Sequence, residues 1–231
     1  MSANAIRLDG RPARFWTSTN GKKAVMALSG IVLVGFVVVH LLGNLQVFAG
    51  ADKFNAYAHA LKGMAPLLWT VRLMLLAAVC LHIWSAFSLW RIKAEARPIG
   101  YVTKKTIAST YASRTMYWSG PILLLFIIYH LMQFTIGIGG TRFIQDEAYD
   151  NLVAGFEVPA VSVFYIIAMG CLCLHLYHGV WSMLQTLGIQ HPKYTPVLRV
   201  LAKVLAVAVF LGFTSIPLGV MLGRIQPSGI F

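Results

Sequence analysis

Five stretches of this 231-residue chain are long and apolar enough to cross a lipid bilayer, and they constrain the fold more than any other feature. A transmembrane helix needs about 20 predominantly apolar residues. Charged residues make up 11% of the chain, whereas a soluble domain carries about 25%. The sequence therefore predicts an all-α membrane protein with five transmembrane helices in one bundle. The expected spans are residues 23–48, 66–91, 115–138, 158–187 and 197–222.

The charged residues lie between the apolar runs, and their distribution predicts the orientation of the bundle. Three regions hold 14 of the 19 Lys and Arg residues: the N-terminal segment through Lys23, the loop 91–114 and the region 190–203. The loops 49–65 and 140–157 hold five of the seven acidic residues. Because cytoplasmic loops are enriched in Lys and Arg, we expect a cytoplasmic N-terminus and an outer C-terminus. The net charge of +12 thus reflects membrane topology, and no nucleic-acid partner is expected.

The polar segments divide the chain into a short head and one membrane domain. Residues 1–22 form a cytoplasmic basic head, and residues 23–231 form the transmembrane domain. Ser18, Thr19 or Asn20 can cap the first helix. Apolar residues at helical spacing in the loops 49–65 and 140–157 predict short helices that lie in the membrane interface.

Four histidines inside the first four spans are the candidate functional residues, because an ionisable side chain at membrane depth is costly. They are His40, His82, His130 and His175. At 1.5 Å per residue, His40 and His130 lie about 24 to 25 Å from the cytoplasmic surface, whereas His82 and His175 lie about 14 to 18 Å from it. Two imidazoles at one height on facing helices are typical of a bis-histidine haem. The two levels therefore predict two haem sites.

Small residues beside the histidines favour this interpretation over other sites. Gly43, Ser85 and Gly179 each lie one turn from a histidine and leave room for a flat ring. A single histidine in a span can instead bond to a neighbouring helix or serve a proton path. A zinc or non-haem iron site would need carboxylates or a cysteine cluster at one level, and no Asp or Glu lies in any expected span. The chain has no C-x-x-C-H motif, so the expected haem is not covalently attached.

The chain resembles the cytochrome b membrane-anchor subunits of bacterial succinate:quinone oxidoreductases, in their five-helix form with two haems. Three motifs carry the resemblance: SGIVLVGFVVVHLLGNLQVF in the first span, FNAYAHAL with LLWTVRLMLLAAVCLHIW into the second, and HLYHGVWSMLQTLG in the fourth. The resemblance implies two b haems, with spans I and III binding the outer haem and spans II and IV the inner one. It favours His175 over His178 as the ligand in span IV, because a glycine, Gly179, follows His175 by four residues.

Other roles follow from the resemblance or from the expected depth of each residue. Each ligand imidazole should be oriented through its second ring nitrogen, which we expect to bond to a backbone carbonyl one turn back. Arg72 is the candidate partner of a haem propionate, or else it extends to the outer surface. The candidate quinone-binding residues lie near the cytoplasmic surface: Lys23, Ser29, His178 and Trp181. A second quinone site near the outer haem is left open.

The resemblance also implies partners and a function. The partners would be a flavoprotein subunit and an iron–sulfur subunit, docked on the basic cytoplasmic face of a multi-pass protein of the bacterial inner membrane. The chain has no nucleotide motif, so it would anchor these subunits and carry electrons to quinone, expected to be menaquinone, without oxidising succinate itself. The alternative is the diheme anchor of a hydrogenase or formate dehydrogenase. The direction of the reaction and a higher oligomer of the complex are left open.

Overall fold

Five long helices dominate the computed structural model, which describes residues 15–96, 99 and 109–229. They are α1 (Thr19–Asn44), α3 (Ala65–Glu95), α4 (Tyr111–Leu131), α6 (Pro159–Thr186) and α7 (Thr195–Met221). Each is long and apolar enough to cross a membrane, α1 and α4 together with the short helical turns that follow them. The described part of the chain contains no strand. The predicted fold class, an all-α protein with five membrane-spanning helices, is confirmed.

Local sequence signals explain where these helices begin and end. The Ser18 hydroxyl caps α1 by accepting from the amide of Gly21 at 2.9 Å, so Ser18 is the cap among the three candidates. Thr110 caps α4 in the same way, at 3.1 Å from the amide of Ser113. Proline lies in the first turn of α3, α6 and α7, where its missing N–H leaves no bond unmade. At its other end, α4 runs into a π-helical turn, Met132–Ile136, which Gly137 ends with a positive φ of 83°.

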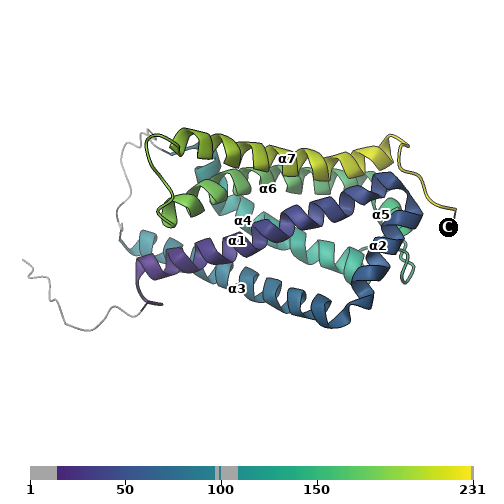
Figure 1. Ribbon diagram of the computed structural model, residues 1–231, viewed down its shortest axis with the longest axis horizontal. Coiled ribbons are helices and arrows are strands. Elements are labelled where there is room, and N and C mark those ends of the chain that lie inside the picture. The colour runs from purple at the N-terminus through teal and green to yellow at the C-terminus, as the bar shows by residue number, and fades with distance from the viewer. Residues whose placement is uncertain (1–14, 97–98, 100–108, 230–231) are drawn as a thin grey trace, which may run out of the picture.

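The helices pack as an up-and-down bundle in which some pairs touch and others face each other across the centre. Helix α1 packs against α3, α6 and α7, and α6 packs against α4 and α7. Among the described residues, neither α1 with α4 nor α3 with α6 makes more than a marginal contact. Figure 1 shows α7 along one edge of the bundle and α3 along the other. The pairs α1/α4 and α3/α6 are therefore the two diagonals of a four-helix arrangement, with α7 packed outside it.

Two short helices cover one end of the bundle: α2 (Ala51–Gly63) and α5 (Ala148–Phe156), which lie close together in Figure 1. Most residues of α2 are exposed or half-buried. Both short helices predicted for the loops 49–65 and 140–157 are present, and in α5 every residue from Tyr149 to Phe156 is buried. The reason for this burial is tertiary packing, because α5 contacts α2, α6, α7 and the π-helical turn.

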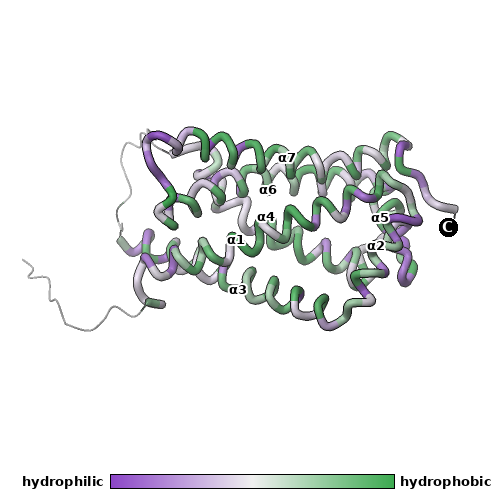
Figure 2. Tube along the Cα trace, viewed as in Figure 1, coloured by the Kyte–Doolittle hydropathy of each residue, from purple (hydrophilic) through white to green (hydrophobic). Residues whose placement is uncertain are grey.

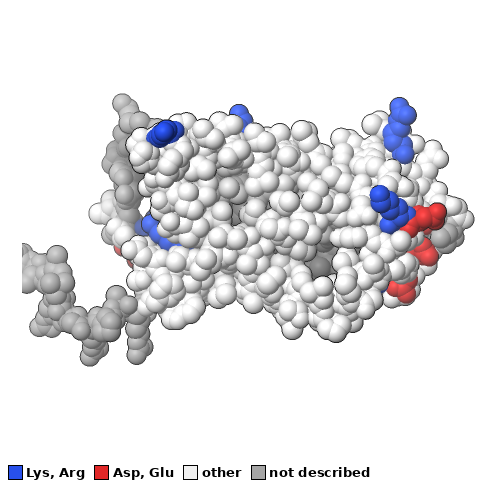
Figure 3. Space-filling model, in the orientation of Figure 1, with Lys and Arg blue, Asp and Glu red and all other residues white. Residues whose placement is uncertain are grey.

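Charged residues gather at the two ends of the bundle, and the surface between them is almost uncharged (Figure 3). Hydrophobic residues fill the middle of the long helices, and hydrophilic ones are concentrated at the ends (Figure 2). The acidic side chains in view lie over the end formed by α2 and α5. This is the end predicted to face outward. Several basic residues that the sequence analysis assigns to the cytoplasmic side lie outside the described residues: Arg7, Arg11, Arg14, Arg97, Lys104 and Lys105.

Candidate functional site: two histidine pairs

The four candidate histidines come together as two pairs, and each pair bridges one diagonal of the bundle. His82 of α3 and His175 of α6 have ring centroids 6.2 Å apart, with their planes inclined by 52°. His40 of α1 and His130 of α4 have centroids 5.8 Å apart, with planes at 88°. These are the pairs expected at the inner and outer levels. The two helices of each pair are not packed against each other, so each pair of imidazoles joins two helices that are otherwise apart.

The separation of the rings matches that of two ligands on one metal ion. An imidazole nitrogen lies about 2 Å from a bound metal ion, so two imidazoles on opposite sides of one ion have ring centres roughly 6 Å apart. Both measured distances are close to this value. Among the described residues, no three His, Cys, Asp or Glu side chains gather where they could hold a metal ion. A haem iron needs only two protein ligands, because the porphyrin supplies the other four.

The inner histidines contact serine hydroxyls on neighbouring helices. His82 Nδ1 lies 3.2 Å from the hydroxyl of Ser29 on α1, and His175 Nδ1 lies 3.3 Å from the hydroxyl of Ser119 on α4. Ser29 is 6% exposed and Ser119 is 2% exposed, so both contacts are shielded from solvent. In both cases Nδ1 is the ring nitrogen that makes this contact, and Nε2 takes no part in it. The backbone of Met26 on α1 also bonds to His82.

The outer histidines have different neighbours. His130 Nδ1 lies 3.3 Å from the Tyr165 hydroxyl of α6, which donates to Gln133 Oε1 at 2.8 Å. Gln133 is 1% exposed and lies in the π-helical turn just after α4, a distortion common at functional sites. Beside His40, the side-chain nitrogen of Asn44 lies 3.4 Å from each ring nitrogen and donates to the His40 carbonyl at 2.8 Å.

The distance between the two levels can be counted along the helices that carry a residue of each level. Ser29, which contacts the inner pair, precedes His40 on α1 by eleven residues, and Ser119 precedes His130 on α4 by the same number. Eleven residues are about 16 Å along a helix. On α6, Tyr165 of the outer level and His175 of the inner level are ten residues apart, or about 15 Å. Three helices thus give one consistent separation.

Two features beside the inner pair fit a bound haem. The Ser85 hydroxyl, one turn from His82, is fully buried and has no hydrogen-bond partner. An orphaned buried hydroxyl costs about 1 to 3 kcal/mol, so a polar group of a ligand would relieve this cost. A Cβ placed on Gly179, one turn from His175, would meet nothing within 4 Å, which indicates open space on the face of α6 that carries the ligand. The residues present therefore fit a flat ring with polar substituents.

The quinone candidates lie on α1 and α6, near the inner end of the bundle. Lys23 is exposed, and His178 is half-buried one turn beyond His175. The Ser29 hydroxyl donates to the Val25 carbonyl at 2.7 Å and also contacts His82. Trp181 is covered by the guanidinium of Arg199 on α7, at 4.6 Å from the ring centre.

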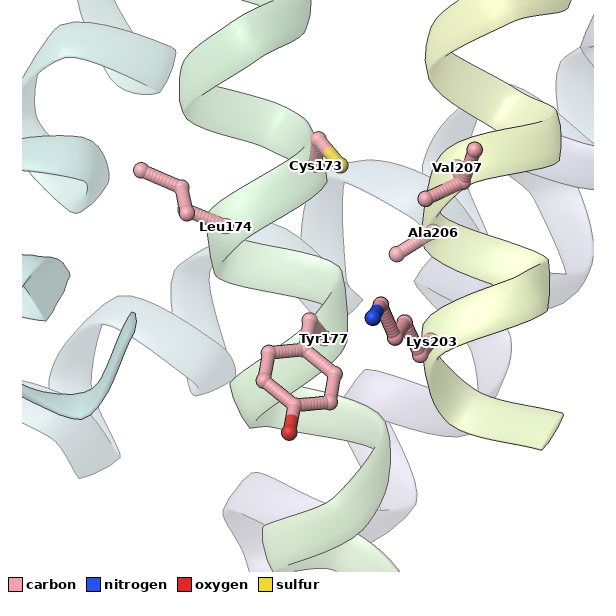
Figure 4. A pocket seen from close by; sticks show the side chains of 6 residues that line it. All are labelled: Cys173, Leu174, Tyr177, Lys203, Ala206 and Val207. Atoms are coloured by element: carbon pink, nitrogen blue, oxygen red, sulfur yellow. The ribbon is translucent and has the colours of Figure 1, made fainter. Parts of the chain in front are cut away.

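A separate hollow of about 270 Å³ lies between α6 and α7. Figure 4 shows Tyr177 and Lys203 lining it from the two helices, together with Cys173, Leu174, Ala206 and Val207. Tyr177 follows His175 by two residues, about 200° around the helix. The hollow therefore lies on the face of α6 away from the inner histidine pair. At the other end of the bundle, Arg72 is exposed, with its guanidinium 5.1 Å from the ring centre of Trp69.

Comparison with known proteins supplies the remaining observation. The chain is similar to the succinate dehydrogenase cytochrome b558 subunit of Bacillus subtilis (strain 168), with 22% identity over 166 residues, which cover 71% of this chain and 77% of that protein. The resemblance to succinate dehydrogenase cytochrome b subunits is confirmed. Together with the five long apolar helices, it makes this chain a multi-pass membrane protein related to a cytochrome b anchor. No protein-family model matches the chain, and no solved structure does.

Three polar residues beside the histidine pairs were not among the sequence predictions: Ser119 and Tyr165, which each contact a histidine, and Gln133, which accepts from Tyr165. One signal could have found the first, since a serine precedes a histidine by eleven residues in both α1 and α4. Eleven residues are close to three helical turns, so the serine and the histidine share one face. No comparable spacing marks Tyr165 or Gln133, because their contacts depend on how α4 and α6 pack.

Proposed function

We propose that this chain is the membrane-anchor cytochrome b subunit of a bacterial succinate:quinone oxidoreductase, and that it binds two b haems. The observation that carries the proposal is the meeting of four histidines in two pairs, with ring centres 5.8 and 6.2 Å apart. The named relative supports the succinate dehydrogenase assignment. In this proposal the chain carries electrons between an iron–sulfur subunit and membrane quinone, without acting on succinate itself.

His82 and His175 would hold the inner haem, and His40 and His130 the outer one. Bound haem supplies a one-electron redox centre, and two axial imidazoles leave no open position for oxygen. The protein holds the four rings in place, and its apolar helices exclude water around them. The buried Ser85 hydroxyl is the proposed contact for a polar edge of the inner haem. Arg72 remains our candidate for a propionate of the outer haem, which requires it to leave the Trp69 ring.

The two levels would let electrons move partway through the membrane. Their separation of about 16 Å along the helices is about half of the 30 Å hydrocarbon core. We propose that the inner level faces the cytoplasm, because the end of the bundle nearer His82 and His175 carries most of the Lys and Arg residues that the structure describes. A flavoprotein subunit and an iron–sulfur subunit would dock on that end.

Quinone would bind between the inner pair and the cytoplasmic surface. We propose Lys23, His178 and Trp181 as its contacts, with menaquinone as the substrate. An apolar slot with a few donors is typical of such sites, and Arg199 adds a cation beside Trp181. Ser29 belongs with the inner pair instead, because its single proton is donated to the Val25 carbonyl.

Co-expression with the flavoprotein and iron–sulfur subunits tests the function. Membranes that contain all three chains should reduce menaquinone with succinate, and succinate should reduce the b haems in the absence of quinone. A matched complex with His82→Ala should keep succinate oxidation by a soluble dye but lose quinone reduction. A purified complex in which succinate never reduces a b haem would contradict the proposal. Stable assembly with hydrogenase or formate dehydrogenase subunits instead would favour the alternative.

A further inference from the structure

We infer that Ser29, Ser119 and Tyr165 are positioning residues, each of which orients one haem ligand through a hydroxyl oxygen. Ser29 acts on His82, Ser119 on His175 and Tyr165 on His130. The inference rests on the proposed haem sites and adds residues that hold the ligands in the state that binds iron. It also assigns different surroundings to the two haems.

The direction of the hydrogen bonds at Ser29 determines what its hydroxyl does to His82. A hydroxyl has one proton, and that of Ser29 is donated to the Val25 carbonyl at 2.7 Å. The oxygen can therefore only accept from His82, so the proton of the neutral ring lies on Nδ1. The lone pair of Nε2 is left free for a metal ion. The serine thus selects the tautomer that can act as a ligand.

Ser119 of α4 lies beside the other inner histidine, His175 of α6. Its hydroxyl lies 3.3 Å from His175 Nδ1 and donates to the sulfur of Met116 at 4.0 Å. Helices α1 and α4 therefore each carry one outer histidine and, eleven residues earlier, one serine for an inner histidine. The four helices of the two diagonals are interlocked, because each outer-ligand helix also supports an inner ligand.

The outer level uses a longer chain of bonds. The Tyr165 hydroxyl donates its proton to Gln133 Oε1 at 2.8 Å, so its oxygen is an acceptor for His130 Nδ1 at 3.3 Å. Gln133 lies in the π-helical turn and is buried, and its Nε2 has no hydrogen-bond partner, so the bond from Tyr165 is what orients its amide. His40 differs, since the side-chain atom beside its ring is the donor nitrogen of Asn44. The outer haem would thus have one supported ligand and the inner haem two.

Such hydrogen bonds should lower the reduction potential of the iron. An oxygen that accepts from Nδ1–H makes the imidazole more basic, and a more basic ligand stabilises the oxidised, more positive iron. Removing one acceptor should therefore raise the potential of the haem at that level only. A tenfold change in a one-electron equilibrium corresponds to about 59 mV, so a change of severalfold is measurable by redox titration.

Redox titration of four single variants in the assembled complex tests the inference. Ser29→Ala should raise the midpoint potential of the inner haem and shift its low-spin electron paramagnetic resonance signal, with the outer haem unchanged. Tyr165→Phe should raise the midpoint potential of the outer haem and shift its signal, with the inner haem unchanged. Ser162→Ala is the matched control, because this serine is equally buried and donates to the Phe156 carbonyl. It should move neither potential. Ser29→Thr keeps a hydroxyl at this position, so the potential of its inner haem should lie closer to that of the unmodified complex than in Ser29→Ala.

The outcomes separate this inference from the proposed function. If the unmodified complex binds no haem, the proposed function fails. If it binds two haems, and Ser29→Ala and Tyr165→Phe change neither potential nor signal, the inference alone is overturned. Loss of only the inner haem from Ser29→Ala supports the assignment, whereas equal shifts of both haems in either variant contradict it.

Discussion

Replacing His82 by alanine should remove one haem and spare the other. His82 and His175 meet at the inner level, and within the described part of the chain the ring contacts join His82 to His175 and His40 to His130, not one pair to the other. With His82→Ala, the inner iron would keep only His175 as a protein ligand. We expect the haem content to fall from two per chain to one. The remaining haem should be the outer, low-spin one.

The distance between the levels sets how far the outer haem should be disturbed. The levels are about 16 Å apart along α1 and α4. Sites more than about 7 to 10 Å apart with no shared partner are independent within about 0.5 kcal/mol. That energy is about a twofold change in affinity, since RT is about 0.6 kcal/mol. The affinity of the outer site for haem should therefore stay within about twofold of its value in the unmodified protein.

The assay is the haem content per purified chain, measured with the reduced-minus-oxidised absorption spectrum. His130→Ala is the mirror variant and should remove the outer haem instead. His59→Ala is the control, because His59 is an exposed histidine on α2, and both haems should remain. Equal loss of both haems from His82→Ala, in protein that still inserts into the membrane, would refute the assignment of two separate levels. Retention of both would refute His82 as a ligand.

Three further outcomes follow from single contacts. Asp150→Ala should lower the free energy of unfolding by about 2 to 4 kcal/mol, because the fully buried carboxylate accepts from the amide and hydroxyl of Ser228 at 2.8 and 2.6 Å. Thermal unfolding in detergent measures this, and an unchanged melting temperature would contradict it. His178→Ala should keep two haems per chain but slow quinone reduction, and loss of the inner haem would instead make His178 a ligand. The hydrogen bond from the Lys62 ammonium lowers the pKa of the Asp146 carboxyl. This ion pair therefore stabilises the fold above the pKa that Asp146 has in the unfolded chain, and the stabilisation is lost as the pH falls through the lower pKa of the folded state. The melting temperatures of Asp146→Asn and the unmodified protein should therefore differ slightly at neutral pH and converge in acid. A difference that grows in acid would contradict this prediction.

The sequence was sufficient to predict the five long helices and which histidines would meet. Both predictions depend on properties that are local along the chain, namely the length of the apolar runs and the depth of each histidine within its run. The distance between levels was predicted less well. Depths counted from the expected cytoplasmic ends of the four spans placed the levels about 6 to 11 Å apart, whereas the contacts place them about 16 Å apart. The cytoplasmic ends of the four spans therefore do not all lie at one depth.

The parts that could not be predicted depend on contacts between distant segments. Ser29 and His82 are separated by 53 residues, and Ser119 and His175 by 56. The burial of α5 is another example, because Asp150 is held by Ser228, 78 residues further along the chain. No local pattern specifies such partners. An apolar helix of nine residues in a polar loop resembles a surface helix until the C-terminal segment is known to cover it.

The most direct test of the central claim is to determine the number and ligation of haems in the unmodified protein. Chemical analysis of haem per chain and electron paramagnetic resonance of the oxidised iron can be done on one purified sample. The paired histidines predict two b haems per chain, both low-spin with two axial imidazoles. One haem per chain, or a high-spin iron with a single histidine ligand, would contradict the account.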